Sequence, residues 1–386
     1  MTIISVIIPT HNRAKYAIPT IRSVLEIGGE LEVVVTDTSD KDEISCAFPD
    51  VDGRLKVIRP SKKLNVVENF ELGIKNSCGD YLIFIGDDDL VVDWIVELAY
   101  WAKNNGVDAL KTTLPAHYYW PDFKHKRRGD HYSGTVHINK FTGSVRKIDA
   151  IAAMRAAADD LGGGVLLMPR AYVGMVSRDL VDGIVKKYGS FFGGVSPDIY
   201  SAALISKESR CCIELDYPVI VPGSSGASTA GQSASGGHVG GLRDNAHIGA
   251  FKDLIWDPLI PEFYSVPTVW SYSFIKALKK IDGGVELANF PRLYIKCLLY
   301  HRAYRKQTIE SIKFFQKNNG KYNTSFMMSK SFLREVIWIV KRVYGNLIGM
   351  ADLSDIEVLG DVEDSSAARR RVLDYLNSRP LILKSL

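Results

Sequence analysis

The sequence lacks a long hydrophobic run, and it has few cysteines. No stretch approaches the roughly 20 uninterrupted apolar residues that a transmembrane helix needs. The start, MTIISVIIPTHNR, has neither the basic region nor the small-residue cleavage site of a signal peptide, so we interpret it as a first strand. The five cysteines are odd in number and follow neither zinc-ligand nor CxxC spacing. These absences predict a cytoplasmic globular protein with reduced thiols.

Glycine is missing from the segment after the first strand, PTHNRAKY. A dinucleotide-binding GxGxxG turn and a GxxxxGK[ST] phosphate loop both need glycines at that point, because the backbone approaches the phosphates closely. The segment therefore argues against a nicotinamide-dependent dehydrogenase and against a P-loop kinase.

The first third of the chain alternates β-branched runs with amphipathic segments. We expect strands at 4–9, 32–37, 55–60 and 81–86, and helices at about 14–27 and 64–77. Short Val- and Ile-rich runs separated by helices predict βαβ units and a parallel sheet covered on both sides. In such sheets, ligands bind at the carboxyl ends of the strands.

Polar clusters stand at the predicted carboxyl ends of three strands: Thr10–Arg13, Asp37–Asp40 and Asp87–Asp89. The last cluster ends a buried run, YLIFIG, with three consecutive carboxylates. Adjacent buried carboxylates are costly unless a cation or a metal neutralises them. The sequence therefore predicts a ligand site on this edge of the sheet, with a positive group in it.

Two segments of the middle region stand out by composition. Residues 117–132 are basic and aromatic, which predicts an exposed loop or hairpin; without a base-stacking fold we expect no nucleic-acid partner. Residues 223–241 hold seven Gly, five Ser and one Thr, which predicts a mobile loop. A helix is expected at 148–161, between these segments.

From residue 246 onward, helical patterns dominate. The expected helices cover 265–281, 286–304, 307–318 and 328–347, followed by an acidic surface segment at 351–364. Residues 261–346 carry 15 Lys and Arg against 5 Asp and Glu. This excess indicates either an anionic partner, such as a membrane surface or a phosphate-bearing substrate, or a solvated helical face.

Three motifs in order, SVIIPTHNRAKY, VVVTDTSD and GDYLIFIGDDD, resemble family 2 glycosyltransferases with the GT-A fold. The resemblance covers about residues 1–105. It implies an α/β, Rossmann-like domain that binds a nucleoside-diphosphate sugar, with UDP-sugars favoured. It also implies the assembly of a bacterial surface polysaccharide.

The resemblance assigns roles to the polar clusters. Pro9, Thr10, Arg13 and Asp37 are expected in the donor nucleotide pocket, together with Asp87 and Asp88. Asp89 is expected to be the direct ligand of Mn²⁺ or Mg²⁺, with Asp87 beside it. His11 and Thr36 depart from the family pattern, which leaves the identity of the base open.

Two further candidates lie beyond the clear match. Asp198 in SPDIYSAAL resembles the acidic catalytic residue of such enzymes and is our candidate general base; a helix start with a first-turn Asp explains the same pattern. His238, inside the Gly/Ser-rich segment, is a candidate metal or phosphate contact on loop closure. A loop histidine without such a role is equally compatible with the pattern.

We therefore expect a GT-A catalytic domain at 1–245 and a mainly helical region at 246–386. The predicted function is metal-dependent, inverting transfer of a sugar, of the hexosyltransferase type, to a hydroxyl of a glycan or lipid-linked acceptor. Peripheral contact with the inner face of the cell membrane and a homo-oligomer are both compatible with the helical region. The alternatives are a sugar nucleotidyltransferase and a non-catalytic glycan-binding or scaffold protein of the same fold.

Overall fold

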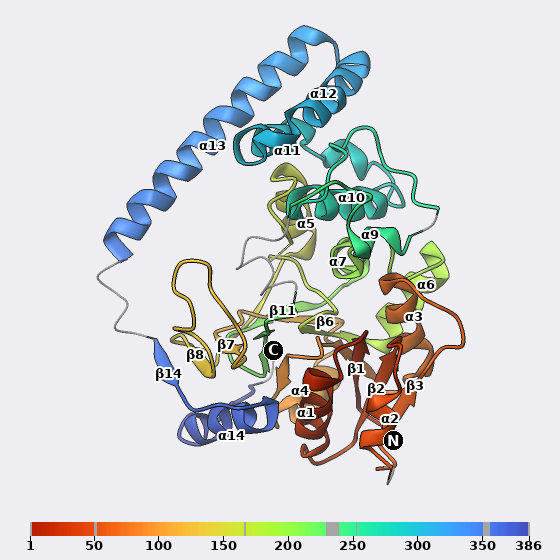
Figure 1. The fold of residues 1–386 in the computed structure, drawn as a ribbon, viewed down its shortest axis with the longest axis vertical. Helices are drawn as coiled ribbons and strands as arrows, with labels where there is room; N and C mark the ends of the chain where they lie inside the picture. Colours follow the sequence, from red (N-terminus) through yellow and green to blue (C-terminus); the bar gives the residue numbers. More distant parts are fainter. Residues whose placement is uncertain are drawn as a thin grey trace.

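The computed structural model describes residues 2–49, 52–165, 167–228, 239–251, 253–349 and 356–384. Within these residues, eight strands form a central sheet with the order β3-β2-β1-β4-β10-β6-β11-β9 (Figure 1). The strands are β1 Ile4–Thr10, β2 Leu31–Asp37, β3 Leu55–Ile58, β4 Tyr81–Phe84, β6 Ala109–Thr112, β9 Val145–Lys147, β10 Gly174–Ser177 and β11 Cys212–Leu215. Strands β1 to β4 are parallel to one another, as the sequence predicts.

Two smaller sheets lie beside the central one. The first pairs β5 Leu90–Val91 with β12 Ile220–Val221. The second has the order β13-β7-β8-β14, with β7 Ala116–Tyr119, β8 Thr135–Ile138, β13 Gly223–Ser224 and β14 Glu357–Leu359. The basic, aromatic segment 117–132 thus forms part of the β7–β8 hairpin, as expected.

Helices cover both faces of the central sheet (Figure 1). The helices of the described residues are α1 Ala14–Leu25, α2 Glu43–Ala47, α3 Val66–Asn76, α4 Ile95–Asn104, α5 Ala150–Asp159, α6 Arg178–Tyr188, α7 Pro197–Glu208, α9 Ala246–Gly249, α10 Val266–Leu278, α11 Phe290–Tyr300, α12 Arg305–Asn319, α13 Lys321–Gly349 and α14 Ser365–Leu376. Helices α11, α12 and α13 pack against one another rather than against the sheet. Short 3₁₀ turns lie at Val285–Leu287 and Arg302–Tyr304.

The sheet separates two hydrophobic cores, because successive side chains of a strand point to opposite faces. On β1, Ile7 packs into the core with α3, α5, α6, α7 and α10, whereas Val6 and Ile8 pack into the core with α1, α4 and α14. All seven residues of β2 are buried. Burial on both faces explains why these strands are continuous Val and Ile runs rather than alternating ones.

The end of the chain returns to the N-terminal domain. Strand β14 pairs antiparallel with β8, and α14 packs against α1 with Ala368, Val372 and Leu376 buried at a spacing of four residues. Arg369 pairs with Asp93 at 2.6 Å and with Glu26 at 2.7 Å. The segment from residue 356 onward therefore packs on the N-terminal domain. The predicted division at residue 245 does not include this contact.

Two predictions differ from the structure in detail. Strand β10 runs antiparallel between β4 and β6, so the sheet is not wholly parallel. Of the mobile loop predicted over 223–241, Gly223 and Ser224 form β13, and Ser225 and Ser228 are buried. Residues 229–238, which include His238, lie outside the described residues.

Candidate active site

The site lies where β1 and β4 end. Residues of β1 pair in register with β2 and β4, so that Thr10 lies opposite Asp37 at one edge of the site. The Thr10 hydroxyl donates to Asp87 Oδ2 at 2.6 Å. The polar clusters predicted from the sequence thus meet, because parallel strands bring their carboxyl ends to the same edge.

Arg13 is the cation beside the carboxylates. Its Nε lies 2.8 Å from Asp87 Oδ1, and its Nη2 lies 3.0 Å from Asp88 Oδ2. Burial works against the charged form of Arg13, but Asp87 and Asp88 outweigh it, and the net effect raises the pKa of Arg13. The expected positive group is therefore present within the chain itself.

The turn after β4 is held by Asp89. Its Oδ2 accepts the Gly86 N–H at 2.6 Å, and its Oδ1 accepts the Gly223 N–H at 2.7 Å. The Tyr172 hydroxyl also donates to Asp89 Oδ2, at 3.1 Å. Both oxygens of Asp89 thus accept hydrogen bonds from the protein. If Asp89 is the direct metal ligand that the sequence predicts, it must bind the metal while it also holds the turn.

Asp88 is bound on one oxygen. Its Oδ2 accepts the backbone N–H of Ser225 at 3.1 Å and the Ser225 hydroxyl at 2.7 Å. Its backbone carbonyl accepts the Trp120 indole N–H at 2.9 Å. Among the described residues, no hydrogen bond reaches Asp88 Oδ1, which leaves that oxygen available to a ligand.

One arginine does not neutralise three carboxylates. Burial raises the pKa of Asp87 well above its usual range, with Asp88 and Asp89 adding to the shift and Arg13 opposing it. Burial and Asp88 likewise raise the pKa of Asp89, against the N–H groups of Gly223 and Gly86. The cluster is therefore short of positive charge.

Hard divalent cations such as Mg²⁺ and Mn²⁺ fit this donor set. They prefer carboxylate oxygens, and Mg²⁺ sites commonly use one or two carboxylates together with substrate phosphates. Asp87 and Asp88 offer such a pair once Arg13 turns from Asp87 to the phosphates, because Arg13 and Thr10 now occupy both oxygens of Asp87. In the described part of the chain no group of three or more Asp, Glu, His or Cys side chains forms a metal cage, so the phosphates would have to complete the shell.

Asp37 lies at the end of β2 and is buried. Its carboxylate is ion-paired with Arg59 and accepts the Ser39 N–H at 2.8 Å. Asp37 is thus next to Thr10 across the strand pair, as a nucleotide-pocket residue should be, but it already has partners within the chain. Pro9, half-buried, precedes Thr10 on β1.

Asp198 lies in the first turn of α7, directly after Pro197. The start of α7 is held by Ser273 of α10, whose hydroxyl oxygen accepts the N–H groups of Val195 at 3.0 Å and Ser196 at 2.8 Å. Helices α7 and α10 approach closely here, since a side chain at Gly194 would lie 2.6 Å from Ser273 Oγ. The candidate base therefore lies at the start of a helix whose position is fixed by packing against α10.

Tyr172 interacts electrostatically with Asp198 and with the carboxylate cluster, and Arg170 interacts with Asp198 and Tyr172. Burial raises the pKa of Tyr172 well above its ordinary value, and the negative charges of Asp89, Asp88 and Asp198 add to the shift. Burial lowers the pKa of Arg170, and Asp198 opposes that shift. Within the described residues, Arg170 Nε is buried without a hydrogen-bond acceptor.

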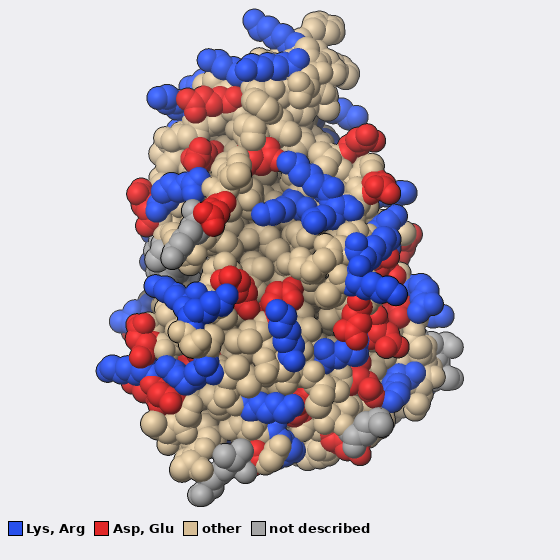
Figure 2. All heavy atoms as spheres, turned by 90° about the vertical axis from the view of Figure 1, so that its right-hand side faces the viewer, with Lys and Arg blue, Asp and Glu red and all other residues tan. Residues whose placement is uncertain are grey.

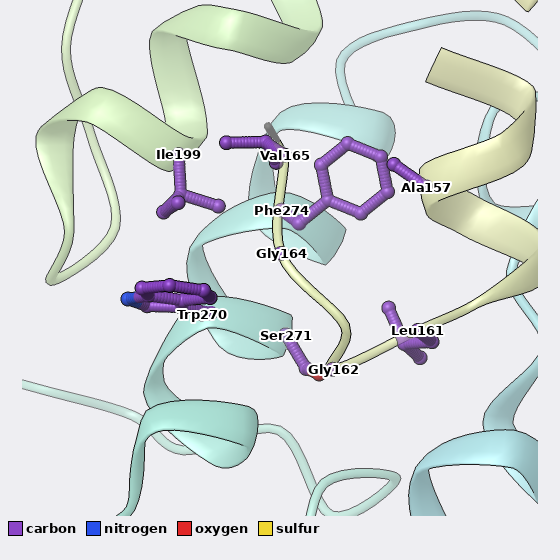
Figure 3. Close-up of a pocket in the computed structure, with 9 residues that line it drawn as sticks. All are labelled: Ala157, Leu161, Gly162, Gly164, Val165, Ile199, Trp270, Ser271 and Phe274. Atoms are coloured by element: carbon purple, nitrogen blue, oxygen red, sulfur yellow. The ribbon is translucent and has the colours of Figure 1, made fainter. Parts of the chain in front are cut away.

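Two pockets lie near α7. The first is a small apolar one between α5, α7 and α10, with Ile199, Trp270 and Phe274 around it (Figure 3). Its volume of about 10 Å³ holds about one water molecule and no sugar ring. The second has a volume of about 390 Å³, and Gly194, four residues before Asp198, lines it together with Lys63, Glu68 and Lys276.

Sequence reasoning missed Tyr172, Arg170, Ser225 and Gly223. Tyr172 and Arg170 follow a Gly-rich turn and have no motif spacing around them. Ser225 and Gly223 belong to a segment whose composition indicates a loop. The structure explains why residue 223 is glycine: a Cβ there would lie 1.7 Å from the Asp88 carbonyl oxygen.

Because the backbone of Gly223 lies so close to Asp88, a substitution at Gly223 tests the described arrangement of Asp87–Asp89. Gly223→Ala should displace the Asp88–Asp89 turn and weaken nucleotide binding by at least about tenfold, since overpacking forces the backbone to shift. Gly240→Ala, with no atom within 4 Å of the added Cβ, is the matched control. Equal nucleotide affinities of the two variants, measured by calorimetry, would contradict this geometry.

The sequence profile of glycosyl transferase family 2 matches residues 5–161. The chain is 38% identical over 109 residues to an uncharacterised glycosyltransferase of Rickettsia conorii, which covers 27% of this chain and 18% of that protein. It is 28% identical over 102 residues to glycosyltransferase GlyG of Streptococcus pneumoniae, covering 25% of this chain and 34% of GlyG. The chain thus spans well under half the length of these relatives.

Among solved structures, the chain is similar to Staphylococcus aureus TarS, residues 1–349, in complex with UDP-GlcNAc. The TM-score is 0.46 at 12% identity, with 83% of this chain and 93% of that chain covered. The family match and the parallel strands β1 to β4 confirm the predicted fold class, an α/β GT-A domain with a mainly helical C-terminal region. Residues 5–161 therefore form a domain of glycosyl transferase family 2, which confirms the resemblance seen in the sequence.

Proposed function

We propose that this protein transfers a sugar, with inversion, from a nucleoside-diphosphate donor to a hydroxyl of a glycan or lipid-linked acceptor. The observation that carries the proposal is the meeting of Thr10, Arg13 and Asp87–Asp89 at the carboxyl ends of β1 and β4. These residues lie inside the part of the chain that matches the family. The family also supports a UDP-sugar donor and an acceptor in bacterial surface polysaccharide.

The donor nucleotide would bind along the ends of β1 and β2. Pro9 and Thr10 offer backbone groups and a hydroxyl to the base, and Asp37 lies next to Thr10 for contact with the base or the ribose. Arg13 is within reach of the diphosphate, because it already lies against Asp87 and Asp88. The guanidinium fork matches phosphate oxygens as well as it matches carboxylate oxygens.

Asp88 and Asp87 would hold a divalent cation, Mn²⁺ or Mg²⁺, together with the donor diphosphate. Such a cation, when bound, supplies Lewis-acid neutralisation of the charge that develops on the departing diphosphate. Asp88 Oδ1 is the oxygen that the described residues leave open. Asp89 would keep its bonds to Gly86 and Gly223 and so hold the turn in shape.

Asp198 would act as general base. Its carboxylate takes the proton of the acceptor hydroxyl while that oxygen attacks the anomeric carbon; the bond from that carbon to the phosphate oxygen breaks, and the nucleotide leaves with the electron pair. Arg170 lies near enough to Asp198 for the carboxylate to oppose the lowering of the Arg170 pKa by burial. The pocket beside Gly194 is large enough for an acceptor sugar, and its lining pairs two cations, Lys63 and Lys276, with two carboxylates, Glu68 and Asp253.

Release of nucleoside diphosphate tests this proposal. The protein is mixed with UDP-, GDP-, CDP- and dTDP-sugars in Mn²⁺, and free nucleoside diphosphate is measured with and without EDTA. We expect slow, EDTA-sensitive release from one nucleotide class, by hydrolysis in the absence of acceptor. Formation of pyrophosphate from a nucleoside triphosphate and a sugar phosphate would instead identify a nucleotidyltransferase, and no turnover together with no nucleotide binding would identify a scaffold.

His238 remains a predicted metal or phosphate contact, since it lies outside the described residues. A cytoplasmic location with peripheral contact to the inner face of the membrane also remains part of the proposal. Among the described residues, no helix combines the length and the apolar character needed to cross a bilayer.

A further inference from the structure

Helix α13 carries an apolar face that nothing in the described part of the chain covers. We call the positions Tyr322, Phe326, Leu333, Ile337, Val340 and Tyr344 its outer face. Their exposed fractions run from 47% for Ile337 to 89% for Tyr322. Spacings of three, four and seven residues put them on one side of the helix.

The opposite side of α13 is anchored to the protein. Thr324, Ser331 and Glu335 are buried there. Glu335 pairs with Arg292 of α11 at 2.6 Å and accepts the Tyr300 hydroxyl at 2.6 Å. Figure 1 shows α13 along an edge of the molecule, with α11 and α12 on one side near its N-terminal half. The outer face is thus held in a fixed orientation, directed away from the body.

The outer face is long, and its positions carry no charge. From Tyr322 to Tyr344 it extends about 33 Å along the helix. At the intervening positions of this side, Ser329, Val336 and Val343 are also uncharged. Monomeric proteins rarely expose an apolar surface of this extent, so it indicates a binding surface.

The helices around this face are strongly basic. Residues 302–349 contain ten Lys and Arg against two acidic residues, and one of these, Glu335, is buried in its pair with Arg292. Lys330 and Lys341 are exposed along one flank of the outer face. In Figure 2, blue side chains predominate at the top of the molecule, where the turn between α12 and α13 lies in Figure 1. The partner of this surface should therefore be negatively charged as well as apolar.

We propose that the outer face of α13 lies in the plane of an anionic lipid surface. Aromatic and aliphatic side chains would enter the boundary between headgroups and acyl chains, and the flanking lysines would meet the acidic headgroups. Pairing with a second copy is disfavoured, because it would bring two strongly basic hairpins together. Phe332, which is exposed outside the outer face, also makes the apolar surface wider than the stripe along which two helices of a coiled coil meet.

This surface would bring the catalytic domain to the place where lipid-linked acceptors lie. That consequence rests on the proposed function. The binding itself does not, because an inactive or differently acting protein with this helix would bind the same vesicles. Failure of lipid binding and failure of the transfer reaction can thus be told apart.

Vesicle flotation of the full chain tests the proposal. Vesicles of phosphatidylglycerol with phosphatidylcholine are compared with vesicles of phosphatidylcholine alone, at low and high salt. We expect binding to the anionic vesicles, weakened by salt, and a partition coefficient at least about tenfold lower for Leu333→Glu combined with Val340→Glu. Ile382→Glu, which changes an equally exposed apolar residue away from α13, is the control and should bind normally.

Two results would overturn the proposal. One is the absence of flotation with anionic vesicles, or flotation that the α13 variant does not change. The other is a dimer in sedimentation that the α13 variant dissociates, without vesicle binding, which would assign the face to a second copy. Nucleotide binding by the α13 variant shows that its catalytic domain is folded.

Discussion

Replacing Asp198 with asparagine will lower kcat by about a thousandfold while the affinity for the donor nucleotide stays unchanged. A general base contributes about 10²- to 10⁴-fold, and an amide cannot take the proton of the acceptor hydroxyl. The nucleotide contacts lie at the ends of β1, β2 and β4, and Asp198 lies on α7. The measurement is steady-state kinetics together with calorimetric titration of the nucleoside diphosphate.

Asp179→Asn is the matched control, because Asp179 is likewise an acid in the first turn of a helix, α6. Loss of an acid there costs each variant the same favourable interaction with the helix dipole, typically about 0.3–1 kcal/mol. Only the Asp198 variant should lose kcat. Equal kcat values for the two variants would show that Asp198 stabilises the start of α7 and is not the general base.

The second large effect concerns Asp88. Asp88→Asn should weaken Mn²⁺-dependent binding of the nucleoside diphosphate by about a hundredfold or more, because it removes half of the carboxylate pair that would hold the cation. Binding measured in EDTA should change much less, since Thr10 and Asp37 remain. The residual affinity is measured by calorimetry in Mn²⁺ and in EDTA.

Asp80→Asn is the control for that experiment. Asp80 precedes β4, so it lies at the opposite end of the strand that leads to the cluster, and its carboxylate pairs with Lys103 at 2.6 Å. This variant should bind nucleotide normally in Mn²⁺. Undiminished Mn²⁺-dependent binding by the Asp88 variant would show that the cation, if one is needed, binds elsewhere.

Strands β1 to β4 could be predicted from the sequence because their physical cause is local. Runs such as ISVIIP must be buried on both faces, and the polar residue after each run then falls on the edge of the sheet. Asp87–Asp89 and Thr10 were found in this way, and the structure brings them together. The helical segments near the C-terminus followed equally from apolar periodicity.

What could not be predicted depends on contacts between distant segments. Ser225 reaches Asp88 across 137 positions, and nothing in a Gly/Ser-rich composition signals that its first residues pack as a strand. Strand β10 is short, and its antiparallel direction is set by tertiary packing between β4 and β6. The different partners of the three carboxylates also depend on such contacts. Asp87 contacts Thr10 and Arg13, Asp88 contacts Ser225, and Asp89 accepts the N–H groups of Gly86 and Gly223.

Calorimetric titration of UDP, GDP, CDP and dTDP, first in Mn²⁺ and then in EDTA, tests the central claim most directly. The arrangement of Thr10, Arg13 and Asp87–Asp89 predicts tight binding of one nucleotide in Mn²⁺, with UDP favoured, and binding weaker by about a hundredfold or more in EDTA. Absence of binding to any of the four in either condition would contradict a diphosphate-binding role for Asp87 and Asp88.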